Sequence, residues 1–136
     1  YAGFGDAGCW FTINPNYKTI NVKNQINDAE SIYSYYKKLI QLRKNYPIIV
    51  YGDFHPLYEE SEKNYCYIRE LGKEKLLVLC SFSEEEQLVE LPDEFSGRKG
   101  ITLISNYDKL IDLNNCIEDE KTVLLKAYEA RVIYYN

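Results

Sequence analysis

The spacing of hydrophobic positions along this chain changes at Pro47. Before it, apolar residues recur every three or four positions and form one broad stripe made of Ile32, Tyr35, Tyr36, Leu39, Ile40 and Leu42. This period predicts a helix over 29–46, with Asp28 as its N-cap. Pro47 is expected to end the helix, because proline lacks the amide hydrogen that a helix interior needs.

After Pro47 the period falls to two, which is typical of half-buried strands. The alternation predicts strands at 49–54, 64–70, 75–82, 87–91, 101–105, 122–126 and 131–135. Residues 71–74 read as a hairpin connection, and residues 127–130 are expected to join the last two strands as a pair. About seven short strands in this arrangement predict a mainly β fold, an antiparallel β-sandwich preceded by a loop and one long α-helix.

Two segments refine this picture. Residues 76–79 are apolar at every position, so they are expected to form a central strand that is covered on both faces. Residues 1–27 contain glycine, proline and asparagine at a density typical of a loop. A loop this long with large aromatic residues is unusual in an independent domain, so we expect it to lie across another surface.

Charge and composition exclude some partners. The formal net charge is −5, and no cluster of lysine and arginine is present, which argues against nucleic acid as a partner. No apolar run is long enough to cross a membrane, and none reads as a signal peptide. The acidic runs 59–62 and 84–86 read as solvated loops. The 14 tyrosines suit a pleated, half-buried surface and, less commonly, a sugar-facing one.

The residues that could carry chemistry are few. Four scattered cysteines and one histidine, His55, do not form a zinc-ligand pattern. Cys66 and Cys80 lie in apolar strands, so we expect reduced thiols and a cytoplasmic protein. No nucleophile-elbow, dinucleotide or phosphate-loop motif occurs. We therefore assign no catalytic, cofactor-binding or metal-binding residue and no cofactor.

Several short runs, in an unbroken order, resemble one family. They are Ala2-Gly3-Phe4, Trp10, Asn14-Pro15-Asn16-Tyr17, Ile20-Asn21-Val22, the helical run 35–44, Tyr51-Gly52-Asp53-Phe54 and Tyr128-Glu129-Ala130-Arg131-Val132. Together they resemble the C-terminal part of oligo-1,6-glucosidase-like α-glucosidases of the α-amylase superfamily (glycoside hydrolase family 13). The sequence departs from the family pattern at Gly5-Asp6-Ala7, Cys9, Thr12 and Ala127.

The resemblance implies a division of the chain. Residues 1–47 would be the tail end of a catalytic barrel, a loop plus the last helix, and residues 48–136 a C-terminal β-sandwich domain. In the family the nucleophile Asp, the acid/base Glu and a third Asp lie earlier in the barrel, and a whole barrel needs about 250 residues. Trp10 and Phe4 would either line the rim of the parent's pocket or pack under their loop.

These observations predict a non-catalytic, structural C-terminal portion of an enzyme that hydrolyses α-glucosidic bonds with retention. The expected partner is the missing catalytic barrel of the parent chain, and a chain without that barrel is expected to self-associate. An alternative is a free-standing carbohydrate-binding β-sandwich module. A third reading, an enzyme complete in itself, requires a barrel that these 136 residues do not contain.

Overall fold

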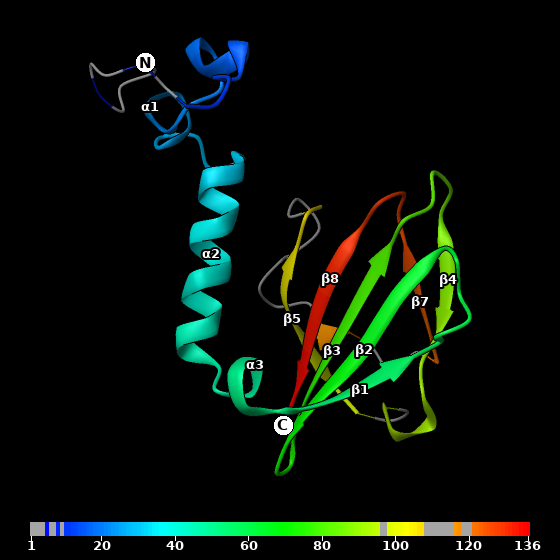
Figure 1. Ribbon diagram of the computed structural model, residues 1–136. Helices are drawn as coiled ribbons and strands as arrows, with labels where there is room; N and C mark the ends of the chain where they lie inside the picture. Colours follow the sequence, from blue (N-terminus) through cyan, green and yellow to red (C-terminus); the bar gives the residue numbers. More distant parts are fainter. Residues whose placement is uncertain (1–4, 6–7, 9, 96–97, 108–115, 118–120) are drawn as a thin grey trace. The chain divides into compact units, whose positions relative to one another are not determined.

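The computed structural model describes residues 5, 8, 10–95, 98–107, 116–117 and 121–136 (Figure 1). The chain forms two compact units, Tyr1–Gln41 and Leu42–Asn136, and the division falls inside the long helix. None of the helices in the described part of the chain is long and apolar enough to cross a membrane.

The first unit contains more helix than the sequence predicts. Within residues 1–27, a 3-10 turn, η1, covers Pro15–Lys18, and a short helix, α1, covers Val22–Gln25. Asn14 accepts the amide hydrogen of Asn16 and caps η1, while Asn21 accepts that of Asn24 and caps α1. Asparagine caps such turns through its side-chain oxygen, which explains helical turns in a segment without hydrophobic period.

The long helix, α2, covers Ile32–Asn45, so the predicted start at residue 29 is wrong. Asp28 accepts the amide hydrogen of Glu30 over 2.9 Å and forms a turn instead of a cap. The cap is Ser31, whose Oγ accepts the amide hydrogen of Ser34 over 3.2 Å. Asp28 and Ser31 are both favoured cap residues, and the turn at Asp28 delays the helix to Ile32.

The apolar stripe of α2 is exposed. No residue of the helix is buried; Ile32, Tyr36 and Ile40 are each more than half exposed, and Leu39 is 36% exposed. The hydrophobic period therefore predicted the helix correctly, but the residues that the structure describes leave its stripe exposed.

Pro47 ends α2 as predicted, but the residues after it do not begin a strand. Ile48–Tyr51 form a short helix, α3, and the strand β1 follows at Asp53–Leu57. Pro47 stands at the N-cap of α3, where a missing amide hydrogen costs nothing. Ile48 is fully buried against the sheet, so tertiary packing overrides the strand preference of this apolar run.

The second unit is an antiparallel sandwich, as predicted (Figure 1). One sheet has the order β1-β2-β3-β8-β5-β6, and the other pairs β4 with β7. The remaining strands are β2 Asn64–Leu71, β3 Glu74–Ser81, β4 Gln87–Glu90, β5 Gly100–Ser105, β6 Cys116–Ile117, β7 Thr122–Leu125 and β8 Ala130–Tyr135. A 3-10 turn, η2, covers Asp93–Phe95.

The hairpin between β2 and β3 forms as predicted, and Gly72 takes a positive φ of 63° in its turn. The predicted pairing of the last two strands is wrong. β7 pairs with β4 in the small sheet, whereas β8 lies between β3 and β5 in the large sheet. The chain changes sheet in the corner at 126–129, where Tyr128 adopts a φ of 53°.

The two faces of the large sheet have different cores. The inner face packs against the small sheet and buries Cys66, Ile68, Leu77, Leu79, Ile133 and Tyr135 together with Val89, Phe95, Val123 and Leu125. The outer face buries Leu76 and Val78 against Ile48. β3 is therefore covered on both faces at 76–79, which confirms the prediction for this strand.

Candidate functional site

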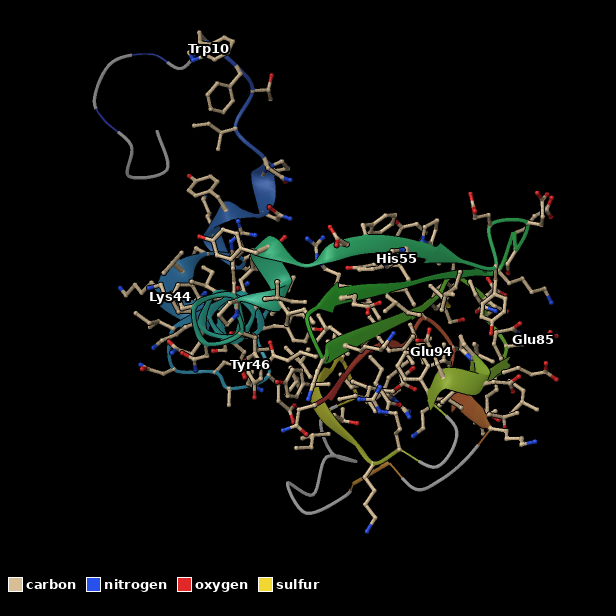
Figure 2. The ribbon with its side chains drawn as sticks, turned by 90° about the horizontal axis from the view of Figure 1, so that it is seen from below. Trp10, Lys44, Tyr46, His55, Glu85 and Glu94 are labelled. Atoms are coloured by element: carbon tan, nitrogen blue, oxygen red, sulfur yellow. The ribbon has the colours of Figure 1, made fainter. Side chains whose placement is uncertain are left out.

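The described residues show no metal-ligand cluster. They contain no group of three or more histidine, cysteine, aspartate or glutamate side chains that could hold a metal ion. His55, labelled in Figure 2, is an exposed residue of β1. The sequence led us to assign no site residue.

The two acidic runs lie on neighbouring loops. Residues 59–62 belong to the connection between β1 and β2, and residues 84–86 to that between β3 and β4. Lys63 approaches Glu85, which is labelled in Figure 2, to 4.0 Å, and both side chains are largely exposed. Such an exposed pair contributes little to stability, so these loops are solvated surface.

A buried carboxylate that the sequence analysis did not single out lies at the corner between β7 and β8. Glu129 is 1% exposed and accepts three hydrogen bonds. Its Oε1 accepts from Ser105 Oγ at 3.0 Å and from Arg131 Nε at 2.8 Å, and Arg131 Nη2 forms an ion pair with it at 2.7 Å. Its Oε2 accepts the amide hydrogen of Lys126 at 2.9 Å.

This arrangement is structural. A buried charge is tolerated when it is paired and its lone pairs are satisfied. Glu129 links β5, β8 and the end of β7, which belong to two different sheets. Because its oxygens are occupied and removed from water, it has no free position for a substrate. Glu129 lies within the run 128–132, which is one of the runs that carry the family resemblance. The sequence therefore contained a signal for this residue, although its burial was not predicted.

The cysteines that the structure describes are free thiols. Cys66 is buried in the inner core, and Cys80 belongs to the outer face of the same sheet. Burial raises the pKa of both thiols, which disfavours the nucleophilic thiolate. Their side chains lie on opposite faces of the sheet, so they do not form a disulfide with each other. The side chains of Cys9 and Cys116 lie outside the described residues.

An exposed aromatic surface of the second unit lies on the outer face of the large sheet. We call it the aromatic face and define it as Phe54, Tyr65, Tyr67 and Phe82. The Phe54 and Tyr67 ring centroids are 5.0 Å apart, and those of Tyr65 and Tyr67 are 5.6 Å apart. Phe82 follows β3 with the same alternation as Val78 and Cys80, and its amide bonds to the carbonyl oxygen of Lys63 at 2.7 Å.

Exposure is uneven within the aromatic face. Tyr67 packs partly against the outer core, and burial raises the pKa of its hydroxyl. Phe54, Tyr65 and Phe82 are 47%, 53% and 66% exposed. The central ring is therefore held by the fold, whereas its neighbours present apolar area to solvent.

The first unit also exposes aromatic residues. Trp10 is 93% exposed and meets the Phe11 ring edge to face at 5.3 Å (Figure 2). Among the described residues, the ring contact recorded for Trp10 is the one with Phe11. Phe4, the other residue considered for a pocket rim, lies outside the described residues.

The described fold is a β-sandwich domain with preceding helices. Two family models match the chain in succession: the catalytic domain of alpha amylase over residues 1–52, and the C-terminal domain of maltogenic amylase over residues 54–131. The chain therefore belongs to the α-amylase superfamily, and its sandwich is a C-terminal domain of that superfamily. The predicted family resemblance is confirmed.

Two similar proteins are oligo-1,6-glucosidases. The chain is 46% identical to an oligo-1,6-glucosidase of Bacillus cereus over 97% of this chain and 23% of that protein. It is 45% identical to an oligo-1,6-glucosidase of Parageobacillus thermoglucosidasius over 96% of this chain and 22% of that protein. The chain thus spans about a fifth of the length of these relatives.

Solved structures show the same similarity. The trehalose-6-phosphate hydrolase of Bacillus licheniformis matches with a TM-score of 0.76 and 35% identity, over 93% of this chain and 22% of that one. An isomaltulose synthase of Erwinia rhapontici matches with a TM-score of 0.76 and 34% identity over the same shares. The similarity includes both the helical segment and the sandwich, because it covers nearly the whole chain.

Proposed function

We propose that this chain is the non-catalytic C-terminal portion of an α-glucosidase that hydrolyses α-glucosidic bonds. Residues 1–47 form the end of the catalytic barrel, and residues 48–136 form the β-sandwich that braces it. The observation that carries the proposal is the succession of a catalytic-domain match and a C-terminal-domain match along one chain. The names of the relatives support an α-glucosidic substrate.

The described geometry suits such a bracing role. The sandwich has its own closed inner core, in which Leu77, Leu79, Leu125 and Ile133 are fully buried. Glu129 joins the two sheets at their corner with charge-assisted hydrogen bonds. A domain built in this way is rigid, and rigidity is what a support for a barrel helix needs.

The direct test compares two proteins. The 136-residue chain should release no glucose from p-nitrophenyl α-glucoside, isomaltose or trehalose 6-phosphate above a buffer blank. The product of the reading frame extended upstream of Tyr1 should hydrolyse at least one of these substrates. Turnover by the shorter chain that survives repurification would refute the proposal, and so would an upstream sequence without a barrel.

A second candidate function is a carbohydrate-binding module, and the aromatic face favours it. Exposed aromatic rings on a flat sheet can stack against the apolar faces of sugars, as amphipathic ring systems do. Titration calorimetry with isomaltose and with soluble dextran tests this candidate. Heat of binding that disappears in Tyr65→Ala, but persists in a Leu88→Ala control on the small sheet, would support it.

The proposed location is the cytoplasm. The support is that Cys66 and Cys80 are free and that burial raises the pKa of both thiols. Reductant should change neither the melting temperature nor the mobility on a non-reducing gel. A mobility shift on reduction would reveal a disulfide and argue for an oxidising compartment.

A further inference from the structure

One end of the sandwich carries the turn η2, Asp93–Phe95, which Figure 1 draws in yellow-green below β4. This turn lies in the connection from β4 in the small sheet to β5 in the large sheet. Phe95 is 2% exposed, and its ring centroid lies 4.7 Å from that of Tyr135, which is 1% exposed. The turn therefore contributes one large aromatic side chain to the inner core.

Lys75 joins this turn to the large sheet. It is the cross-strand partner of Glu70 and lies on the same side of β3 as Leu77, a residue of the inner core. Its Nζ donates to Glu70 Oε2 at 3.1 Å and also to Oε2 of Glu94, which Figure 2 labels. The Lys75 side chain is 16% exposed, and each glutamate side chain is 40% exposed. One ammonium group thus holds a carboxylate of β2 and a carboxylate of η2.

The charges of this trio do not balance. The hydrogen bond to Glu94 raises the pKa of Lys75; burial opposes the rise, and the hydrogen bond to Glu70 adds to it. Lys75 is therefore charged at neutral pH, but two carboxylates surround it. Without the ammonium group, Glu70 and Glu94 would lie near each other as like charges and repel. Removal of Lys75 therefore replaces an attraction by a repulsion.

Arg98 makes a second attachment of the same segment. Its guanidinium lies 5.9 Å from the centroid of the Tyr135 ring, and its Nη2 donates to the carbonyl oxygen of Asn136 at 3.5 Å. Two backbone hydrogen bonds of the segment stay within it: Phe95 donates to Pro92 at 2.9 Å, and Arg98 donates to Phe95 at 3.1 Å. By contrast, β3 is paired on both sides. A segment held mainly by side chains opens at a lower free energy than a central strand.

We propose that η2 and Arg98 form a clasp on the inner core that opens before the rest of the sandwich unfolds, and that Lys75 holds this clasp closed. Opening separates Phe95 from Tyr135 and exposes both rings. Because ion pairs with access to water hold the clasp, ionic strength controls how often it opens. The inference concerns the sandwich itself and does not depend on the activity of a parent enzyme.

Amide hydrogen exchange in the 136-residue chain measures the opening. The Phe95 and Arg98 amides should be less protected than the Leu77 amide in the centre of the large sheet. Lys75→Met keeps the apolar stem but removes the charge, and should lower the protection of Phe95 and Arg98 at least about fivefold. A similar loss of protection at Leu77 would overturn the inference, because Lys75 would then support the whole fold.

The pair of Lys63 and Glu85 provides a matched control. It also joins two connections, but its atoms are 4.0 Å apart and its side chains are 59% and 82% exposed. Such a pair contributes little. Lys63→Met should therefore leave the protection of Phe95 unchanged. Equal effects of Lys63→Met and Lys75→Met would contradict a specific role of Lys75.

Ionic strength gives a readout that a merely structural lysine would not move. Between about 0.01 M and 1 M salt, the Debye length falls from about 30 Å to about 3 Å. Protection of Phe95 should fall with salt in the natural chain, where salt weakens attraction. It should rise with salt in Lys75→Met, where salt weakens the repulsion between Glu70 and Glu94. Lys75→Met/Glu94→Gln lacks both effects and should respond little.

The outcomes decide for or against the clasp. Opposite salt responses of the natural chain and Lys75→Met support it, and responses of the same sign overturn it. If Lys75→Met does not fold, Glu94→Gln tests the same contact from the other partner and should also lower the protection of Phe95. Unchanged protection in Glu94→Gln would overturn the clasp, and so would equal protection of Phe95 and Leu77 in the natural chain.

Discussion

Arg69 donates a hydrogen bond from Nη2 to the carbonyl oxygen of Gly52 over 2.6 Å. Its Nε also donates to the carbonyl oxygen of Ile48 over 3.2 Å. The Ile48 oxygen also accepts the amide hydrogen of Gly52 at 3.0 Å, and Gly52 is the residue that ends α3, where a helix carries partial negative charge. A side chain of β2 therefore caps the turn through which the chain enters the sandwich.

The first prediction concerns this cap. Arg69→Ala should lower the free energy of unfolding by about 1.5–3 kcal/mol, because hydrogen bonds to a charged group are lost. Hydrogen exchange should accelerate at the Tyr51 and Gly52 amides, which bond to carbonyl oxygens at the start of α3. Arg69→Lys is the control, since it keeps the charge but loses the fork of donors. Unchanged exchange in Arg69→Ala would show that α3 does not depend on the guanidinium.

The second prediction concerns the buried carboxylate of Glu129. Glu129→Gln leaves Arg131 unpaired beside a neutral amide, and should destabilise the fold by about 2–3 kcal/mol. The value lies below that of a fully buried pair, because the Arg131 side chain is 19% exposed. Urea unfolding of Glu129→Gln and of the natural chain measures this loss of stability. The exposed Glu84→Gln should change stability by less than about 0.5 kcal/mol. Equal effects in both variants would contradict the structural role.

The third prediction contrasts two leucines. Leu77 is fully buried between the sheets, and Leu77→Ala should cost about 2–5 kcal/mol. Leu39 on α2 is 36% exposed, and Leu39→Ala in this chain should cost less than about 0.5 kcal/mol. Denaturant midpoints of the two variants show whether the two losses of stability differ as expected. A large loss at Leu39 would mean that another surface covers the helix.

The sequence predicted the regular parts of the fold because their hydrophobic period is strong. The interior of α2, the hairpin of β2 and β3, and the two-sided burial of 76–79 follow directly from spacing. It failed at Ile48–Tyr51, where residues that favour strands form a helix because Ile48 is buried and Arg69 donates to the carbonyl oxygens of Ile48 and Gly52. That contact joins positions 21 residues apart, so no local pattern contains it.

The corner between β7 and β8 also depends on contacts between distant positions, which a local sequence pattern does not contain. A connection of four residues between two apolar runs is typical of a hairpin. Here Glu129 holds Ser105 and Arg131, and β7 pairs with β4 instead of β8. The aromatic face was predictable only in part. The tyrosine content indicated a pleated surface, but which rings remain exposed depends on where α3 ends its cover.

The fourth prediction concerns alkaline pH. A hydrogen bond to Glu74, followed by burial, raises the pKa of Tyr134 from 10.0 to about 12, and burial raises that of Tyr135 to about 12. The unfolded chain loses these protons near pH 10, before the folded chain does. The stabilisation is therefore complete below pH 10 and is lost as pH rises towards 12.

The measurement for this effect is the denaturant midpoint between pH 9 and 12. Tyr135→Phe removes one of the two titrating groups, so its stability should fall less steeply with pH than that of the natural chain. Tyr36→Phe, at an exposed position of α2, is the matched control and should follow the natural chain. Parallel curves for all three proteins would contradict the assigned cause.

The fifth prediction is that the 136-residue chain self-associates. Ile32, Tyr36 and Ile40 leave an apolar stripe on α2 in water, and the aromatic face adds exposed rings on the sandwich. Covering apolar area yields about 25 cal/mol per Å², so contact between copies is favourable where the barrel is absent. Light scattering coupled to size exclusion should give a mass above 16.0 kDa that grows with concentration.

Two variants locate the contact. Ile40→Glu should reduce the mass if copies pair through the helix stripe, and Phe82→Glu should reduce it if they pair through the aromatic face. The proposed barrel-containing protein should lose the concentration dependence if its barrel covers these surfaces. A mass that stays at one copy for the short chain at every concentration would refute association, since it would mean that these surfaces tolerate water without a partner.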